Sequence, residues 1–152
     1  METQIIQVIM GMLGTIGFSV LFHVKGKKLI AIALGGALSW VVYLLVLGYS
    51  GNKAAGLLVS TFALGVLAEI FARAFKAPVI SFQVPMLIPL IPGGDLYYTT
   101  DFFVRRMGAE FTDRLNLLLW EAGAIAFGII LAACVMHIPH KSLVKYLERK
   151  RS

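Results

Sequence analysis

Four apolar stretches, each close to the length of a membrane span, divide the chain. A transmembrane helix needs about 20 predominantly apolar residues. The stretches that meet or approach this length are 5–22, 29–47, 54–75 and 115–136. A further apolar stretch, 78–92, is shorter and contains several prolines. The pattern predicts an all-α integral membrane protein with about five transmembrane segments, of which the fourth is short and broken by proline.

The short fourth segment carries the most unusual pattern in the chain. Pro85, Pro89 and Pro92 interrupt it, and Gly93 and Gly94 follow. Each proline removes a backbone N–H donor and clashes with the preceding turn of a helix. In hydrocarbon, irregular backbone is tolerated where protein surrounds it or where it lines a wet cavity. One interpretation is therefore a kinked span that ends in a glycine turn, and the other is a discontinuous segment that lines a transport pathway.

A charged stretch separates this segment from the last apolar one. Over 95–113, aromatic and aliphatic residues are interspersed with charged residues, which predicts an amphipathic helix at the outer surface. Asp95 is its predicted N-cap. The tyrosines near its start suit the membrane–water interface, where the ring is buried and the hydroxyl is hydrated. The pattern assigns no role to Arg105 or Arg106.

The composition agrees with a membrane location. Hydrophobic residues make up 59% of the 152 residues and charged residues 14%, against about 25% charged in an ordinary soluble domain. The chain therefore has too few polar residues to cover a soluble surface. Its net charge of +6 does not indicate a nucleic-acid partner, because the basic residues lie at the ends of apolar runs, where they set membrane topology.

The basic residues also predict the orientation of the chain. If the fourth segment crosses the bilayer, ten of the 14 lysines and arginines lie on one side, which the positive-inside bias makes the cytoplasm. A segment that only dips and returns would place the basic tail outside, against this bias. We therefore expect the N-terminus outside and the C-terminus in the cytoplasm. Residues 1–140 would form a single transmembrane bundle domain, and 141–152 a basic cytoplasmic tail.

Few residues in the chain suggest catalysis. The histidines are not spaced as metal ligands, the single cysteine has no partner, and no nucleophile–base pair is present in the sequence. We therefore expect no enzyme activity, no metal and no cofactor.

Two carboxylates lie within apolar runs, Glu69 and Glu121. A charge inside the bilayer costs about 3 kcal/mol even on lenient scales, so it is expected to face the bundle interior and to be functional. Both are candidates for proton coupling. Glu69 has an alternative role in a pair with Arg73, one helical turn on. Glu121 either stays hydrated near the outer surface or meets a partner group inside the bundle.

Polar side chains near the broken segment are candidates for contacts with a solute. Ser81 and Gln83 lie within it and Asp95 follows it. The complete set of substrate-path candidates is Ser81, Gln83, Pro85, Pro89, Pro92, Gly93, Gly94 and Asp95. Serine and threonine also hold helices together in membrane bundles, which is the alternative role for the hydroxyl groups.

The motif Ile88-Pro89-Leu90-Ile91-Pro92-Gly93-Gly94, the tyrosines after it and the apolar stretch from Glu121 resemble the threonine/serine exporter (ThrE) family, specifically its small YjjB-type subunit. The resemblance covers nearly the whole chain, and the Ile-Pro-x-x-Pro-Gly motif is its specific part. It implies a subunit of a proton-driven secondary transporter in the bacterial plasma (inner) membrane. The expected solutes are small polar metabolites, threonine and serine or small dicarboxylates.

The resemblance also implies a larger YjjP-type membrane subunit as partner, without which this chain should not transport. One alternative is a non-transporting scaffold or stability subunit, whose glycine faces dock a transporting partner. In that case, changes to the proline and glycine motif would reduce the yield of the complex rather than its turnover. A further alternative is a homo-oligomer, which would bury the same small-residue faces between identical chains.

Overall fold

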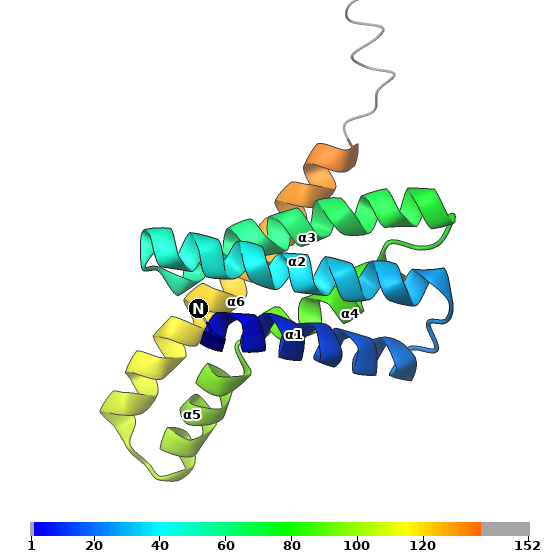
Figure 1. Ribbon diagram of the computed structural model, residues 1–152. Helices are drawn as coiled ribbons and strands as arrows, with labels where there is room; N and C mark the ends of the chain where they lie inside the picture. Colours follow the sequence, from blue (N-terminus) through cyan, green and yellow to red (C-terminus); the bar gives the residue numbers. More distant parts are fainter. Residues whose placement is uncertain (1, 138–152) are drawn as a thin grey trace, which may run out of the picture.

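The computed structural model describes residues 2–137, and every regular element among them is helical. Figure 1 shows their arrangement. In order, the elements are α1 (Glu2–Leu21), α2 (Lys27–Ser50), α3 (Lys53–Phe75), α4 (Ile80–Leu87), the 3₁₀ helix η1 (Ile88–Leu90), α5 (Gly93–Val104) and α6 (Gly108–His137). The predicted tail, 141–152, lies outside the described residues.

Four of the described helices, α1, α2, α3 and α6, are long and apolar enough to cross a membrane. They contain 20, 24, 23 and 30 residues. At a rise of 1.5 Å per residue, even the shortest is about 30 Å long, which matches the hydrocarbon core of a bilayer. The all-α membrane fold and the four full-length predicted spans are therefore confirmed.

The predicted fourth segment is short and broken, as its prolines indicate. α4 has 8 residues with Pro85 inside it, and η1 has 3 residues with Pro89 near its start. Ile91 then adopts an extended conformation, with φ −66° and ψ 127°. Neither helical piece approaches the length of α1, α2, α3 or α6, and part of the fourth segment is therefore irregular backbone.

This broken segment joins the two ends of the bundle. It begins just after the C-terminal end of α3 and leads into α5, where Asp95 contacts Lys53 at the N-terminal end of α3. Between these ends, α4 packs against α1, α2 and α3 (Figure 1). The segment therefore runs from one end of α3 to the other, as the prediction of a crossing requires.

The expectation of one amphipathic helix over 95–113 is wrong, because the chain turns after Val104. Arg106 has a left-handed backbone conformation, with φ 58°. Its N–H donates to the Phe103 carbonyl, and the Met107 N–H donates to the Phe102 carbonyl. These two bonds form a Schellman motif, which ends a helix. α6 then begins at Gly108, so the charged residues up to 113 form its first turns. Asp95 lies in the first turn of α5 and is not its N-cap, which is Pro92.

Small residues determine how closely the helices pack around α3, which has the largest buried share among the four long helices. A Cβ added at Gly128 of α6 would overlap the Thr61 hydroxyl and approach the Leu58 carbonyl oxygen of α3. In the same way, a Cβ at Gly36 of α2 would overlap Thr15 of α1. Absent side chains therefore let these helices approach, as is common in membrane bundles.

α6 crosses α2 and α3 obliquely, as Figure 1 shows. Its first half pairs with α5 in a helical hairpin that extends away from α1, α2 and α3. Its second half packs along α3. The point where the hairpin meets the bundle brings together residues from α2, α3, η1, α5 and α6, and this junction is the candidate site.

Candidate functional site

A small cavity lies at the end of the broken segment. Its volume is about 80 Å³, which is room for several water molecules or a small polar group. Five elements or their connections supply its walls. The lining residues are Trp40, Tyr43, Lys53, Leu57, Pro89, Leu90, Ile91, Pro92, Asp95 and Glu121.

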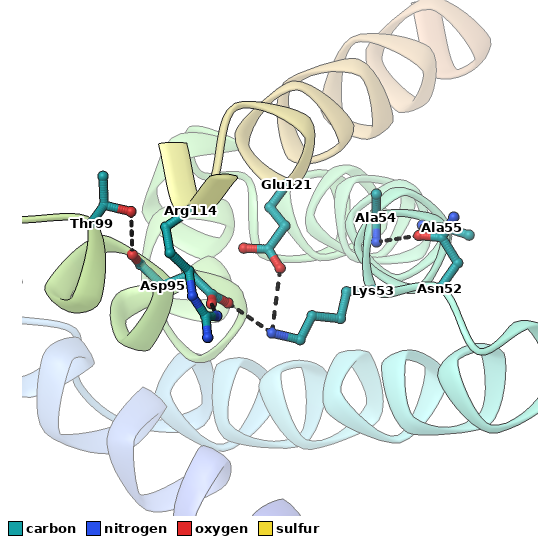
Figure 2. A network of polar contacts seen from close by, with 8 residues as sticks. All are labelled: Asn52, Lys53, Ala54, Ala55, Asp95, Thr99, Arg114 and Glu121. Atoms are coloured by element: carbon teal, nitrogen blue, oxygen red, sulfur yellow. Dashed lines mark hydrogen bonds and ion pairs between the residues drawn. The ribbon is translucent and has the colours of Figure 1, made fainter. Parts of the chain in front are cut away.

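Lys53 enters this site because of the way α3 begins. Gly51 ends α2 in a left-handed conformation, and Asn52 caps α3 by accepting hydrogen bonds from the backbone N–H groups of Ala54 and Ala55. Lys53 is therefore the first residue of α3. Its Nζ atom lies 2.8 Å from Asp95 Oδ2 and 3.7 Å from Glu121 Oε1, so one ammonium group lies between two carboxylates (Figure 2).

A second cation, Arg114 of α6, completes the group. Its Nη1 atom lies 3.0 Å from Asp95 Oδ1, and its guanidinium lies 5.7 Å from the centroid of the Tyr98 ring. Lys53, Arg114, Asp95 and Glu121, here called the ion quartet, thus carry two positive and two negative charges when all are ionised. They connect α3, α5 and α6 across the junction.

Asp95 is the central acceptor of the ion quartet. The hydrogen bond from Lys53 is the main reason why the pKa of Asp95 is lowered below its usual value. Arg114 acts in the same direction, whereas partial burial opposes the shift. Asp95 is therefore ionised at neutral pH and holds both cations.

Glu121 is the most deeply buried member of the ion quartet, with 1% of its side chain exposed. Its Oε2 atom has no hydrogen-bond partner within residues 2–137, and the same is true of the indole Nε1 of Trp40. Both atoms are inaccessible to solvent, and both residues line the cavity. A buried polar group without a partner costs about 1–3 kcal/mol, so such groups are rare in native structures.

Of the predicted substrate-path residues, Pro89, Pro92 and Asp95 line this cavity, and the proton-coupling candidate Glu121 lines it with them. Gly93 and Gly94 adjoin it at the start of α5 and are exposed, with open space around them.

Ser81 and Pro85 instead line a cavity of about 330 Å³ at the start of α4, together with Phe22 and Val24. Gln83 lies in α4 without lining either cavity. The path candidates therefore lie at both ends of the broken segment.

Glu69 lies at the opposite end of α3 from the ion quartet. Its carboxylate is 3.6 Å from Arg73 Nη2 and 3.8 Å from His137 Nδ1. Arg73 also donates a hydrogen bond to the Met136 carbonyl near the end of α6. The alternative pairing of Glu69 with Arg73 is thus present, and the two predicted carboxylates do not share one site.

Sequence reasoning missed Lys53, Arg114, Trp40 and Tyr43. The clearest signal was Lys53, the only basic residue between the second and third spans, directly after a glycine and a helix-capping asparagine. Among residues 2–137, no group of three or more His, Cys, Asp or Glu residues could hold a metal ion.

Comparison with protein families gives a match to the model described as "Threonine/Serine exporter, ThrE", over residues 7–135. Neither the comparison with curated proteins nor the comparison with solved structures gave a match. The family match covers all four long helices and the broken segment between them, leaving out only a few terminal residues of α1 and α6. The chain is therefore a multi-pass membrane protein that belongs to the threonine/serine exporter family.

Proposed function

We propose that this chain is one subunit of a secondary transporter that exports small polar metabolites across the bacterial plasma membrane. The family match supports a threonine/serine-type solute, with small dicarboxylates as the other candidates. The observation that carries the proposal is the cavity at the end of the broken segment, where the buried Glu121 and the partly exposed Lys53 offer charges of both signs. An amino acid presents the complementary pair, a carboxylate and an ammonium group.

The solute path follows the broken segment from one end of the bundle to the other. At its first end, Ser81 lines a cavity of about 370 Å³ with His23, Lys25 and Lys28 of the first connection. These basic groups attract a solute carboxylate at the face that the positive-inside bias assigns to the cytoplasm. At its second end lies the ion quartet. Pro85, Pro89 and Pro92 free backbone carbonyls between the two ends, and Gly93 and Gly94 keep the exit side open.

Glu121 is the proposed coupling carboxylate. Because it is buried beside a single close cation, binding a proton would remove its attraction for Lys53 and leave that ammonium group to Asp95 alone. The charge pattern around the cavity would then change with each proton. Glu69, with Arg73 and His137 beside it, is the second proton-binding candidate, at the far end of the bundle.

The test is efflux of radiolabelled threonine, serine and a small dicarboxylate, with and without an uncoupler. Glu121→Gln should reduce uncoupler-sensitive efflux at least tenfold while the protein accumulates normally, because the amide cannot carry the proton. The control is Glu110→Gln on the exposed first turn of the same helix, which should transport as the wild type does. Normal coupled efflux in Glu121→Gln would make that carboxylate structural only.

The partner in this proposal is a larger YjjP-type membrane subunit. α1 is mostly exposed along its apolar length, with Gly14 and Gly17 facing open space, so this helix offers a surface for another membrane protein. Efflux that requires both chains would support the two-subunit transporter. Efflux from this chain alone would favour a homo-oligomer.

Changes to the proline motif distinguish the proposed role from the alternative, a scaffold subunit that does not form the path. Pro89 packs near Gly11 of α1, so it also has a structural role. If the scaffold role is right, Pro89→Ala lowers the amount of complex and leaves the turnover of the remaining complex unchanged. If the segment lines the path, turnover per complex falls.

A further inference from the structure

The connection between α1 and α2 is basic, and it lies at the same end of the bundle as the start of α4 (Figure 1). It contains Lys25, and α2 begins with Lys27 and Lys28. The first turn of α2 has no acidic residue. Within residues 2–137, no carboxylate lies at ion-pair distance from any of these three lysines. Their charge is therefore not balanced by the part of the chain that the structure describes.

Two adjoining cavities lie beside these lysines. The first, called the basic cavity, has a volume of about 370 Å³ and includes His23, Lys25 and Lys28 in its wall. The second, called the apolar cavity, has a volume of about 330 Å³, and all its lining side chains except that of Ser81 are apolar. Both volumes are in the range of about 300–1,000 Å³ that is typical of small-molecule sites. The residues that line both cavities are Phe22, Val24 and Ser81.

The apolar cavity extends further along α4 than the basic cavity does. Ser81 and Phe82, near the start of α4, line the basic cavity, whereas Val84 and Pro85 line the apolar one. The second pair lies about one helical turn further along the helix. Because α4 leads away from the basic connection into the bundle, a ligand that fills both cavities needs a negatively charged part at the end of the bundle and an apolar part directed inward.

We propose that the two cavities together form a binding site for one anionic phospholipid. The phosphate accepts hydrogen bonds from Lys25 and Lys28 in the basic cavity, and an acyl chain packs against Val84 and Pro85 in the apolar cavity. Basic pockets between transmembrane helices on the cytoplasmic side are suited to anionic lipid headgroups. This inference goes beyond the proposed function, because lipid binding requires no transport.

The apolar cavity favours a phospholipid over a soluble anion. Inorganic phosphate or a small carboxylate could use the basic cavity alone, and would leave the adjoining apolar one unfilled. The proposed solute path begins at the same basic cavity, so a bound lipid and an entering solute would compete for Lys25 and Lys28.

The first experiment tests the recognition of charge. The purified full-length chain in detergent is titrated with phosphatidylglycerol or with phosphatidylcholine of the same acyl chains, and bound lipid is counted by native mass spectrometry. The first phosphatidylglycerol should bind about tenfold more tightly, because the choline group of the other lipid brings a positive charge toward the lysines. Equal binding of the two lipids would contradict the proposal.

The double variant Lys25→Gln/Lys28→Gln tests the basic cavity itself. It should weaken phosphatidylglycerol binding about tenfold or more, the effect of a lost charge-assisted hydrogen bond. The control Lys27→Gln/Lys76→Gln removes the same number of charges from exposed positions that line neither cavity, and should change binding by less than about threefold. The basic tail is identical in both variants, so it does not contribute to the difference. Equal weakening in both would indicate non-specific attraction only and would overturn the site.

The acyl part of the site has a separate test. Val84→Phe fills the apolar cavity and should weaken lipid binding about tenfold, because the chain loses its buried contacts. Ile30→Phe enlarges an exposed apolar side chain of α2 that lines neither cavity, and should leave lipid binding unchanged.

A comparison of ligands decides the matter if Val84→Phe does not accumulate. sn-Glycerol 3-phosphate carries the phosphate without acyl chains, and should bind the wild type at least about tenfold more weakly than phosphatidylglycerol does. Binding of equal strength, or unchanged lipid binding in Val84→Phe, would assign the basic cavity to a soluble anion and overturn the lipid site. Since none of these measurements involves transport, loss of the lipid site would leave the exporter role standing, and a failure to export would leave the lipid site standing.

Discussion

Asp95 is held by two cations that come from different helices, Lys53 of α3 and Arg114 of α6. Asp95→Asn keeps the size of the side chain but removes the charge that both cations contact. We expect it to lower the free energy of unfolding by about 1–3 kcal/mol, since two partly enclosed cations lose their carboxylate. Thermal unfolding of the purified protein in detergent would measure this loss.

The matched control for Asp95→Asn is Asp101→Asn in the same helix. Asp101 pairs with Arg105 one turn away on the surface, and such exposed pairs contribute about 0.5 kcal/mol or less. Equal small losses in the two variants would contradict a special role for Asp95.

The lowered pKa of Asp95 predicts how this stabilisation depends on pH. A carboxyl group whose pKa is lower in the folded than in the unfolded state stabilises fully above its unfolded pKa, about 3.9, and loses this effect as pH falls through the folded value. The difference in melting temperature between wild type and Asp95→Asn should be constant from about pH 8 to 5 and shrink below about pH 4. A difference that already shrinks near neutral pH would contradict this assignment.

At the scale of helices, the α3–α6 contact depends on glycine. Gly128→Ala adds a Cβ against the Thr61 hydroxyl and the Leu58 backbone oxygen, so we expect a loss of about 1–3 kcal/mol from overpacking. Gly123 lies in the same helix and has no atom within 4 Å of an added Cβ. Gly123→Ala should therefore cost nothing in the same unfolding measurement. A loss of equal size in both variants would show that the close approach is unimportant.

The elements that the sequence predicted well are those with a local cause. Apolar length defines α1, α2, α3 and α6, and proline chemistry defines the break between α4 and α5. The turn at Arg106 was missed because a non-glycine residue adopts the left-handed conformation there, and neither charge nor periodicity indicates it. The pairing of Lys53 with Asp95, 42 residues apart, was also missed, because it depends on helix rotation and packing.

At the scale of the whole molecule, the path of the broken segment determines which of the connections between helices lie on the same side of the membrane. With the proposed orientation, Ser50 lies outside and Lys27 lies in the cytoplasm, and both are exposed. In a Cys134→Ser background, a membrane-impermeant maleimide should label Ser50→Cys in intact spheroplasts and Lys27→Cys only after lysis. The reverse pattern would invert the topology, and labelling of both in intact spheroplasts would exclude a single orientation.

The ion quartet has a consequence for the electrical character of the cargo. Its four charges cancel, and an uncompensated charge in an enclosed, weakly polarisable space is costly. A zwitterion can exchange partners with Lys53 and Glu121 without altering that sum. A dianion would bring two negative charges that the quartet cannot balance, so it would have to arrive with two protons. In the proposed transporter, electroneutrality at the quartet would therefore favour amino acids as cargo and would tie any dicarboxylate transport to a higher proton count.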